Sequence, residues 1–146
     1  MMQKEKNLPL PGRDKLLSWL REEDLLVKTR QRRCSTTDSS HHYHKYTNLI
    51  RDFVPYRRNQ LWVTDITYIQ TLEGFIYLNL ITDAYSRKII GWRLAPTLES
   101  KYSIEALNMA INSAEDNISG LIHHSDRGVQ YCCFKYTDIL KEKNIN

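Results

Sequence analysis

Three runs of β-branched, aliphatic and aromatic residues follow one another between residues 61 and 95, and they constrain the fold more than any other feature. The runs cover residues 61–69, 75–83 and 87–95, with only a few residues between them. Runs of this composition joined by short connections are typical of an antiparallel β-meander. Apolar side chains occupy both alternation faces of 61–69, which predicts a strand buried on both sides.

A helix, a strand and a second helix are expected after the meander. Thr97 or Ser100 can cap the first helix, in which apolar residues recur at three- and four-residue spacing. A short fourth strand over 121–125 and a helix over about 136–143 follow. The resulting order, β-β-β-α-β-α, opens ribonuclease H-like α/β domains, although a split α+β sandwich has the same order.

The region before the meander differs in composition. A helix is predicted from Pro11 to about Lys28, followed by a basic cluster and by a polar stretch, 34–48, interpreted as a linker or extended arm. We therefore expect two parts: a basic helical arm and linker over 1–58, and a core domain over 59–146.

Charge is unevenly distributed along the chain. Residues 1–60 carry thirteen Lys or Arg and seven Asp or Glu, a net charge of +6, whereas residues 61–146 have a net charge of −2. A basic leader before a mildly acidic core favours a polyanion such as DNA as partner, with Arg30, Arg32 and Arg33 contacting phosphates. The alternative is a solvated helix end.

Composition excludes several classes of protein. With 41% hydrophobic and 26% charged residues, the chain is far from disordered composition. No apolar run approaches the roughly 20 residues of a membrane span, and the first residues contain no apolar signal-peptide core. Its three cysteines do not form a disulfide framework. A cytoplasmic protein, associated with DNA rather than with a membrane, is expected.

Two aspartates are the candidate catalytic residues and metal ligands. Asp65 lies within the first apolar run, where an isolated ionised carboxylate must be paired, protonated or bound to a cation, and Asp126 follows the fourth strand. If strands one and four are neighbours, the two acids converge, and paired carboxylates favour Mg²⁺ or Mn²⁺. The alternatives are a satisfied buried acid for Asp65 and an Asx turn before Gly128 for Asp126.

Other polar residues are better explained by structure. Asp83 is expected to form the turn after the second strand, and His123 to pack within the fourth strand. The histidines at 41, 42 and 44 invite a zinc site, but no Cys-x-x-Cys accompanies them, so they are assigned to an arm near nucleic acid.

Three blocks of sequence resemble a known family. QLWVTDITYI, YLNLITDAYSRKIIGWRL and HHSDRGVQY are similar to the catalytic core of insertion-sequence transposases related to retroviral integrases, over about residues 59–143. Residues upstream resemble the connector after the helix-turn-helix region of these transposases, so the arm is interpreted as a remnant of that region.

The resemblance implies a ribonuclease H-like fold and an Asp-Asp-Glu triad that binds Mg²⁺ or Mn²⁺. Asp65 matches the first acid and Asp126 the second. The loop residues Arg127, Gly128, Gln130 and Tyr131 match the segment after the second acid, where they are expected to shape the site and to approach the DNA backbone.

The implied activity is DNA cleavage and strand transfer, with mobile-element ends and target DNA as substrates and a homo-oligomer or full-length transposase as partner. In the family the glutamate lies on a later helix, whereas only residues 127–146 follow Asp126 here, and Glu142 does not match. We therefore expect an incomplete fold, inactive alone. The alternatives are a non-catalytic DNA-binding fragment that regulates a full-length transposase, and a structure-selective nuclease.

Overall fold

The computed structural model describes residues 11–26, 40–114 and 117–146. The chain divides into two compact units, 1–34 and 35–146, each considered by itself; the predicted domain boundary after residue 58 stays a prediction. Among the described residues, no helix has the length and apolar character needed to cross a membrane.

In the first unit, helix α2 spans Arg13–Glu22 and follows Pro11–Gly12, where the sequence predicts a helix start. The helix ends at Glu22, earlier than the predicted end at about Lys28, because Asp24 adopts a left-handed conformation with φ of 52°. None of its residues is buried within the described part of the chain, and Trp19 is 47% exposed.

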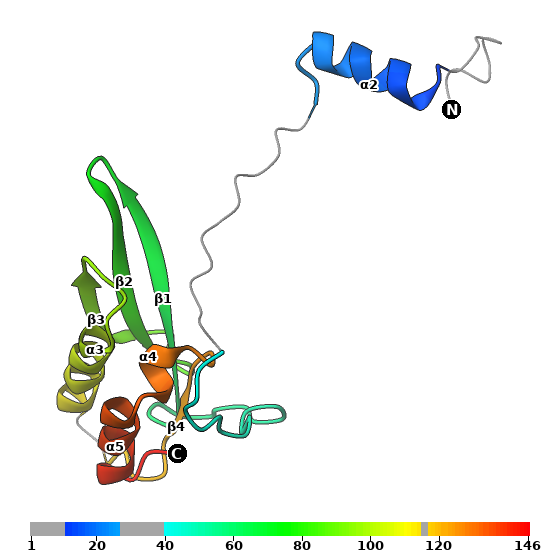
Figure 1. The fold of residues 1–146 in the computed structure, drawn as a ribbon. Helices are drawn as coiled ribbons and strands as arrows, with labels where there is room; N and C mark the ends of the chain where they lie inside the picture. Colours follow the sequence, from blue (N-terminus) through cyan, green and yellow to red (C-terminus); the bar gives the residue numbers. More distant parts are fainter. Residues whose placement is uncertain (1–10, 27–39, 115–116) are drawn as a thin grey trace. The chain divides into compact units, whose positions relative to one another are not determined.

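A four-stranded sheet organises the second unit (Figure 1), with strands β1 (Leu61–Thr71), β2 (Gly74–Asp83), β3 (Ile89–Ala95) and β4 (Ile122–His124). The strand order is β3-β2-β1-β4. Antiparallel pairing joins β1 to β2 and β2 to β3, whereas β4 pairs with β1 in parallel. The predicted meander is therefore confirmed, and strands one and four are neighbours.

Asp83 connects the beginning of β1 to the end of β2. Its buried carboxylate accepts hydrogen bonds of 2.7 Å from the Asn59 backbone N–H and from both the backbone N–H and the hydroxyl of Ser86. Asn59 in turn accepts a hydrogen bond from the Trp62 indole. The prediction that Asp83 forms this turn is confirmed.

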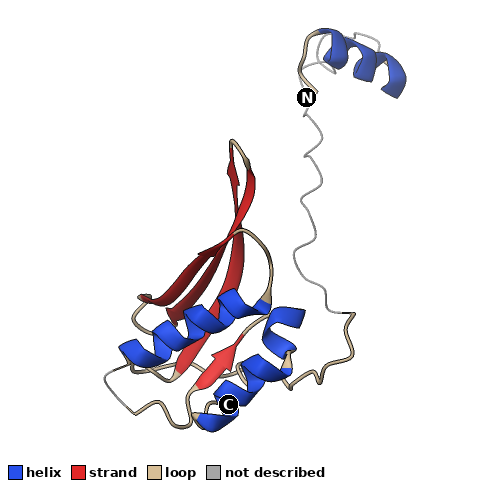
Figure 2. Ribbon diagram, turned by 60° about the vertical axis from the view of Figure 1, so that its left-hand side comes forward, coloured by secondary structure: helices blue, strands red, loops and turns tan. Residues whose placement is uncertain are grey.

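Three helices complete the unit: α3 (Ser100–Ser113), α4 (Val129–Cys132) and α5 (Phe134–Glu142). Helix α3 packs against β2 and β3, as Figure 2 shows. The close approach requires Gly91, since a β-carbon there would overlap the Ala106 carbonyl oxygen and come within 2.9 Å of the Ala110 β-carbon.

The start of α3 differs from the sequence prediction. Glu99 is the N-cap residue, and no side chain makes a capping hydrogen bond. The Thr97 hydroxyl, a predicted cap, instead donates to the Glu99 carboxylate at 2.9 Å. Ser100, the other predicted cap, is the first residue inside the helix.

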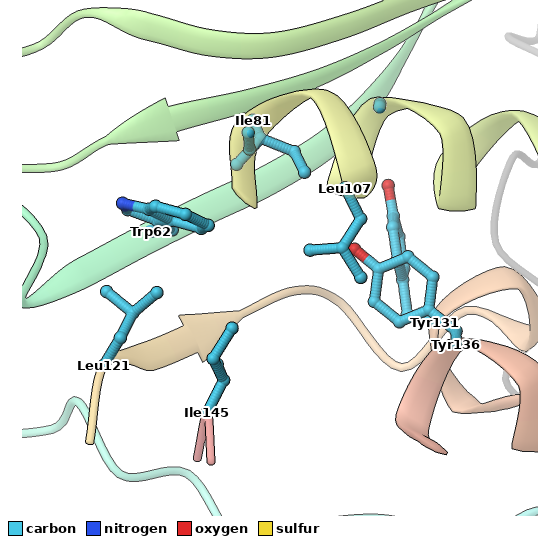
Figure 3. Packing of buried hydrophobic residues seen from close by; sticks show 9 residues of the cluster. Trp62, Ile81, Leu107, Leu121, Tyr131, Tyr136 and Ile145 are labelled. Carbon is cyan, nitrogen blue, oxygen red and sulfur yellow. The ribbon is translucent and has the colours of Figure 1, made fainter. Parts of the chain in front are cut away.

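The hydrophobic core lies between the sheet and these helices (Figure 3). Trp62 and Ile81 from the sheet and Leu107 from α3 are fully buried, in contact with the α4–α5 region. The cluster also contains Ala106, Ala110, Leu121, Tyr131, Tyr136 and Ile145. The core therefore contains residues of β1, β2, α3, α4 and α5, together with residues next to β4 and after α5.

Only one face of β1 is buried, which contradicts the predicted burial on both sides. Trp62 and Thr64 are buried, whereas Val63, Asp65 and Thr67 between and beyond them are exposed. On the same face, Trp92 of β3 is 49% exposed. The exposed face is apolar in composition but is not covered by any described element, so composition alone suggested a buried strand.

The outer edge of β4 is partly paired. The Asn146 backbone N–H donates to the Leu121 carbonyl, and its carbonyl accepts from the His123 N–H, both at 2.8 Å. These two bonds are those of a parallel pairing beside Ile122. The segment after α5 therefore returns alongside β4 and makes a first strand-like contact with it.

Candidate active site

The parallel register of β1 and β4 brings the two candidate acids to the same level. Leu61 lies beside Ile122 and Val63 beside His124, so residue n of β1 lies beside residue n + 61 of β4. Asp65 lies two residues beyond Val63, and Asp126 lies two residues beyond His124, where β4 ends, so both acids follow the same end of the β1–β4 pair. Strands one and four are neighbours, which is the condition that the sequence set for convergence of the two acids.

Both acids are exposed, and this corrects the expected environment of Asp65. Its neighbours Thr64 and Ile66 face the helices, so the carboxylate points to the uncovered side of the sheet. A cation is therefore not required to offset a burial penalty. Instead, both carboxylates lie where solvent, a metal ion or a substrate can reach them.

The loop after Asp126 is held by several hydrogen bonds. Asp126 Oδ1 accepts from the Gly128 N–H at 3.0 Å, which is the Asx turn considered as the alternative for this residue. A β-carbon at Gly128 would come within 2.9 Å of Asp126 Oδ1 and Gln130 Oε1. The Gln130 side chain donates to the Leu98 carbonyl at 3.3 Å and ties the loop to the start of α3.

Tyr131, one of the loop residues expected from the resemblance to shape the site, lies near enough to both acids for their charges to act on its hydroxyl. Burial raises the pKa of its hydroxyl, a contact with Thr64 opposes the rise, and the charges of Asp126 and Asp65 add to it. The hydroxyl is buried without a well-formed hydrogen bond among the described residues. The charges of both aspartates therefore disfavour ionisation of this phenol.

His123 is half-buried in β4 and packs against Tyr136 of the core. Burial lowers the pKa of its imidazole to about 4, and Nε2 shares a hydrogen bond of 3.0 Å with the Tyr136 hydroxyl. Burial also raises the pKa of Tyr136. Both groups are therefore neutral near pH 7, and the prediction that His123 packs within the strand is confirmed.

A cavity of about 600 Å³ lies beside Asp126 and Arg127. Residues before the first strand, among them His44, Tyr46 and Leu49, also line this cavity. Arg127 itself is exposed. Arg30, Arg32 and Arg33, the other predicted DNA contacts, lie outside the described residues.

The linker contacts the loop directly. His41 Nε2 lies 2.9 Å from the Arg127 carbonyl oxygen, and the Tyr43 ring meets the edge of Phe134 at 5.3 Å between centroids. The interpretation of His41 as part of a free arm is therefore wrong. Sequence offered no signal for this contact, because it joins segments 86 residues apart.

The donor atoms fit a hard divalent cation in part. Mg²⁺ is commonly bound by one or two carboxylates together with water and substrate phosphates, and Asp65 and Asp126 provide two. Within the described residues, no cluster of three or more His, Cys, Asp or Glu is arranged to hold a metal. Glu142 pairs instead with Lys143 at 3.2 Å.

Comparison with known proteins adds independent findings. Residues 55–146 match the protein family described as "Integrase core domain". The chain is 37% identical over 135 residues to the IS600 uncharacterized 31 kDa protein of Shigella sonnei, covering 92% of this chain and 49% of that protein. It is 35% identical over 127 residues to transposase InsF of IS3A from Escherichia coli K12, covering 86% of this chain and 44% of InsF.

A solved structure shares the fold. The catalytic core domain of HTLV-2 integrase in complex with magnesium superposes with a TM-score of 0.53 at 17% identity, covering 62% of this chain and 60% of that one. This similarity and the strand order identify the fold as ribonuclease H-like, as predicted. The chain spans about half the length, or less, of the curated relatives it matches.

Proposed function

The chain belongs to the integrase core domain family, and from this premise we propose that it supplies two acids of a metal-dependent site for DNA cleavage and strand transfer in transposition. The observation that supports this most strongly is the parallel pairing of β1 with β4, because Asp65 and Asp126 each lie two residues beyond its last pair, Val63 and His124. Related proteins named as transposases, such as InsF, agree with an action on mobile DNA.

In this proposal, Asp65 and Asp126 hold Mg²⁺ or Mn²⁺ through their carboxylate oxygens. The bound ion would supply Lewis-acid polarisation of a DNA phosphodiester and of the attacking hydroxyl. Arg127, exposed beside Asp126, would contact a neighbouring phosphate. Gly128 and Gln130 fix the loop that carries both residues.

The proposed partners are DNA and further copies of a transposase. Arg30, Arg32 and Arg33 would contact the DNA backbone with little sequence information, as clustered arginines do. Oligomerisation is proposed because the similar HTLV-2 integrase core was solved in dimeric and trimeric forms. A protein of this kind would act in the cytoplasm, at the DNA.

The residues 59–146 are proposed to form the amino-terminal part of the catalytic core, and this part alone is expected to be inactive. Within the described residues, no third acid joins Asp65 and Asp126. Two carboxylates should bind Mg²⁺ weakly, since the remaining ligands would have to be water or DNA phosphate. We expect no strand transfer by this chain in isolation.

A non-catalytic DNA-binding fragment that regulates a full-length transposase is the second candidate. The incomplete acid set is the observation that favours it. The two proposals differ in metal binding, because a regulator requires no surviving metal site.

A titration with Mn²⁺ separates them. Wild-type chain is expected to bind Mn²⁺, and Asp65→Asn and Asp126→Asn should each abolish binding. Asp138→Asn is the matched control, because Asp138 is an exposed acid on α5 that pairs only at the surface with Lys141. Equal binding by all four proteins would reject the proposed site, and metal-dependent joining of transposon ends by this chain would reject its inactivity.

A further inference from the structure

His41 makes a long-range hydrogen bond to the loop after Asp126. Its Nε2 lies 2.9 Å from the Arg127 carbonyl oxygen. A carbonyl oxygen can only accept, so Nε2 carries the proton and donates it. His41 is half-buried, and its Nδ1 atom is fully buried without a partner among the described residues. The ring therefore presents one specific donor to the loop.

Aromatic contacts hold this part of the linker in place. The ring of Tyr43 lies 5.5 Å from that of His41 and 4.3 Å from that of His42. Tyr43 also meets Phe134, the first residue of α5, edge to face. The His41 donor is thus positioned by a small cluster of rings and does not depend on the single hydrogen bond.

The peptide group that receives this hydrogen bond also contacts the second acid. The Arg127 carbonyl and the Gly128 N–H belong to one planar peptide group, so fixing the oxygen fixes the direction of the N–H. That same N–H donates to Asp126 Oδ1 at 3.0 Å. Hydrogen bonds in such a chain also polarise and strengthen one another.

We propose that His41 is a positioning residue, which orients the Asp126 carboxylate through the peptide group between Arg127 and Gly128. The loop would then be fixed from two sides, by His41 upstream and by Gln130, which bonds to Leu98. The importance of this orientation for metal binding rests on the proposed function of Asp126. The orientation of the carboxylate by the peptide group does not depend on that function.

Two substitutions distinguish the hydrogen bond from the ring packing. His41→Phe keeps an aromatic ring against Tyr43 and removes the donor, whereas His41→Gln retains an N–H donor without the ring. His42→Phe is the control, since His42 also contacts Tyr43 and is exposed. Each variant is examined by NMR for hydrogen exchange of the Gly128 amide and for the χ1 couplings of Asp126, and by Mn²⁺ titration.

His41→Phe is expected to accelerate exchange of the Gly128 amide about fivefold, the equilibrium effect of one typical hydrogen bond. It should also average the Asp126 χ1 couplings and weaken Mn²⁺ binding by a similar factor. In His41→Gln, the Gly128 exchange rate, the Asp126 couplings and the Mn²⁺ affinity should all return most of the way to their wild-type values. In His42→Phe, all three should equal the wild-type values.

The proposal would be overturned if His41→Phe left the Gly128 exchange rate and the Asp126 couplings unchanged. It would also be overturned if His41→Gln showed the same changes as His41→Phe. A loop that loosens without any change in Mn²⁺ affinity would reduce His41 to a purely structural contact and also overturn it. Failure of the wild-type chain to bind Mn²⁺ would instead reject the proposed function, while the exchange and the couplings would still test His41.

Discussion

At the residue scale, burial and exposure divide the polar side chains into structural and chemical groups. Asp83 is buried, His123 is half-buried, and both have hydrogen-bond partners. Asp65 and Asp126 are exposed, and Asp126 also accepts a hydrogen bond from the Gly128 N–H. A buried, satisfied group contributes to stability, whereas a ligand can reach an exposed acid. Unfolding experiments therefore test the first pair of residues, and metal-binding experiments test the second.

His123 predicts how stability depends on pH. Its pKa is about 4 in the folded chain, below the ordinary value of 6.5, so the unfolded chain binds a proton first as pH falls. The contribution of the neutral imidazole is complete above pH 6.5 and is lost as pH decreases towards 4. The shift corresponds to at most about 3 kcal/mol.

This contribution is measured by urea unfolding of wild type and His123→Phe at a series of pH values. The difference in unfolding free energy between them should change between pH 6.5 and 4, with wild type losing more on acidification. A difference that is independent of pH would contradict the assignment of His123 to the core.

The residues of the candidate site were only partly predictable from sequence. Asp65 and Asp126 were identified by their places relative to the strands, and their convergence required only that these strands be neighbours. The exposure of Asp65 was not predictable, because exposed Val63 and Trp92 are as apolar as core residues. Tyr131 was expected to shape the site only from the family resemblance, since its proximity to both acids arises only in the folded chain.

At the element scale, the long segments were predictable, and of the short ones β4 was predicted but α4 was not. The strands of the meander were recognisable from composition, and α3 from its apolar spacing. Helix α4 has four residues, about one turn, which is too short to show a helical period. The predicted start of α3 was wrong in detail because the Thr97 hydroxyl bonds a side chain instead of the helix backbone.

Packing of α3 against the sheet predicts that Gly91→Ala destabilises the fold. The added β-carbon would overlap the Ala106 carbonyl oxygen, so the helix or strand must move. Overpacking of this kind costs about 1–3 kcal/mol. Thermal or urea unfolding measures the loss, with Gly12→Ala as control because a β-carbon there meets nothing within 4 Å. Equal stability of Gly91→Ala and wild type would show that α3 lies further from β3.

At the scale of the whole molecule, the sheet has one covered and one uncovered face within the described residues. Helices cover the face of Trp62 and Ile81. The other face exposes Val63, Trp92 and Leu94, which are 37%, 49% and 44% exposed. Contiguous exposed apolar side chains of this kind favour association. The sequence predicted an incomplete fold, but not this uncovered face, because strand composition suggested burial on both sides.

The chain alone is therefore expected to self-associate. Sedimentation velocity at several concentrations should detect oligomers for wild type, and Trp92→Lys should shift the population towards monomer by placing a charge on the uncovered face. Ser113→Lys, at the end of α3, is the control. A wild-type chain that remains a monodisperse monomer and melts cooperatively would contradict this prediction.

The central claim is that Asp65 and Asp126 form a single metal site. Paramagnetic broadening by Mn²⁺ tests it directly, because the ion broadens NMR signals only from nuclei close to it. Amide signals around Asp65 and around Asp126 should disappear together at the same Mn²⁺ concentration. In Asp65→Asn, both sets of signals should remain visible at that concentration. Broadening around only one of the two acids, or first around Asp138 and Glu142 on α5, would contradict a shared site.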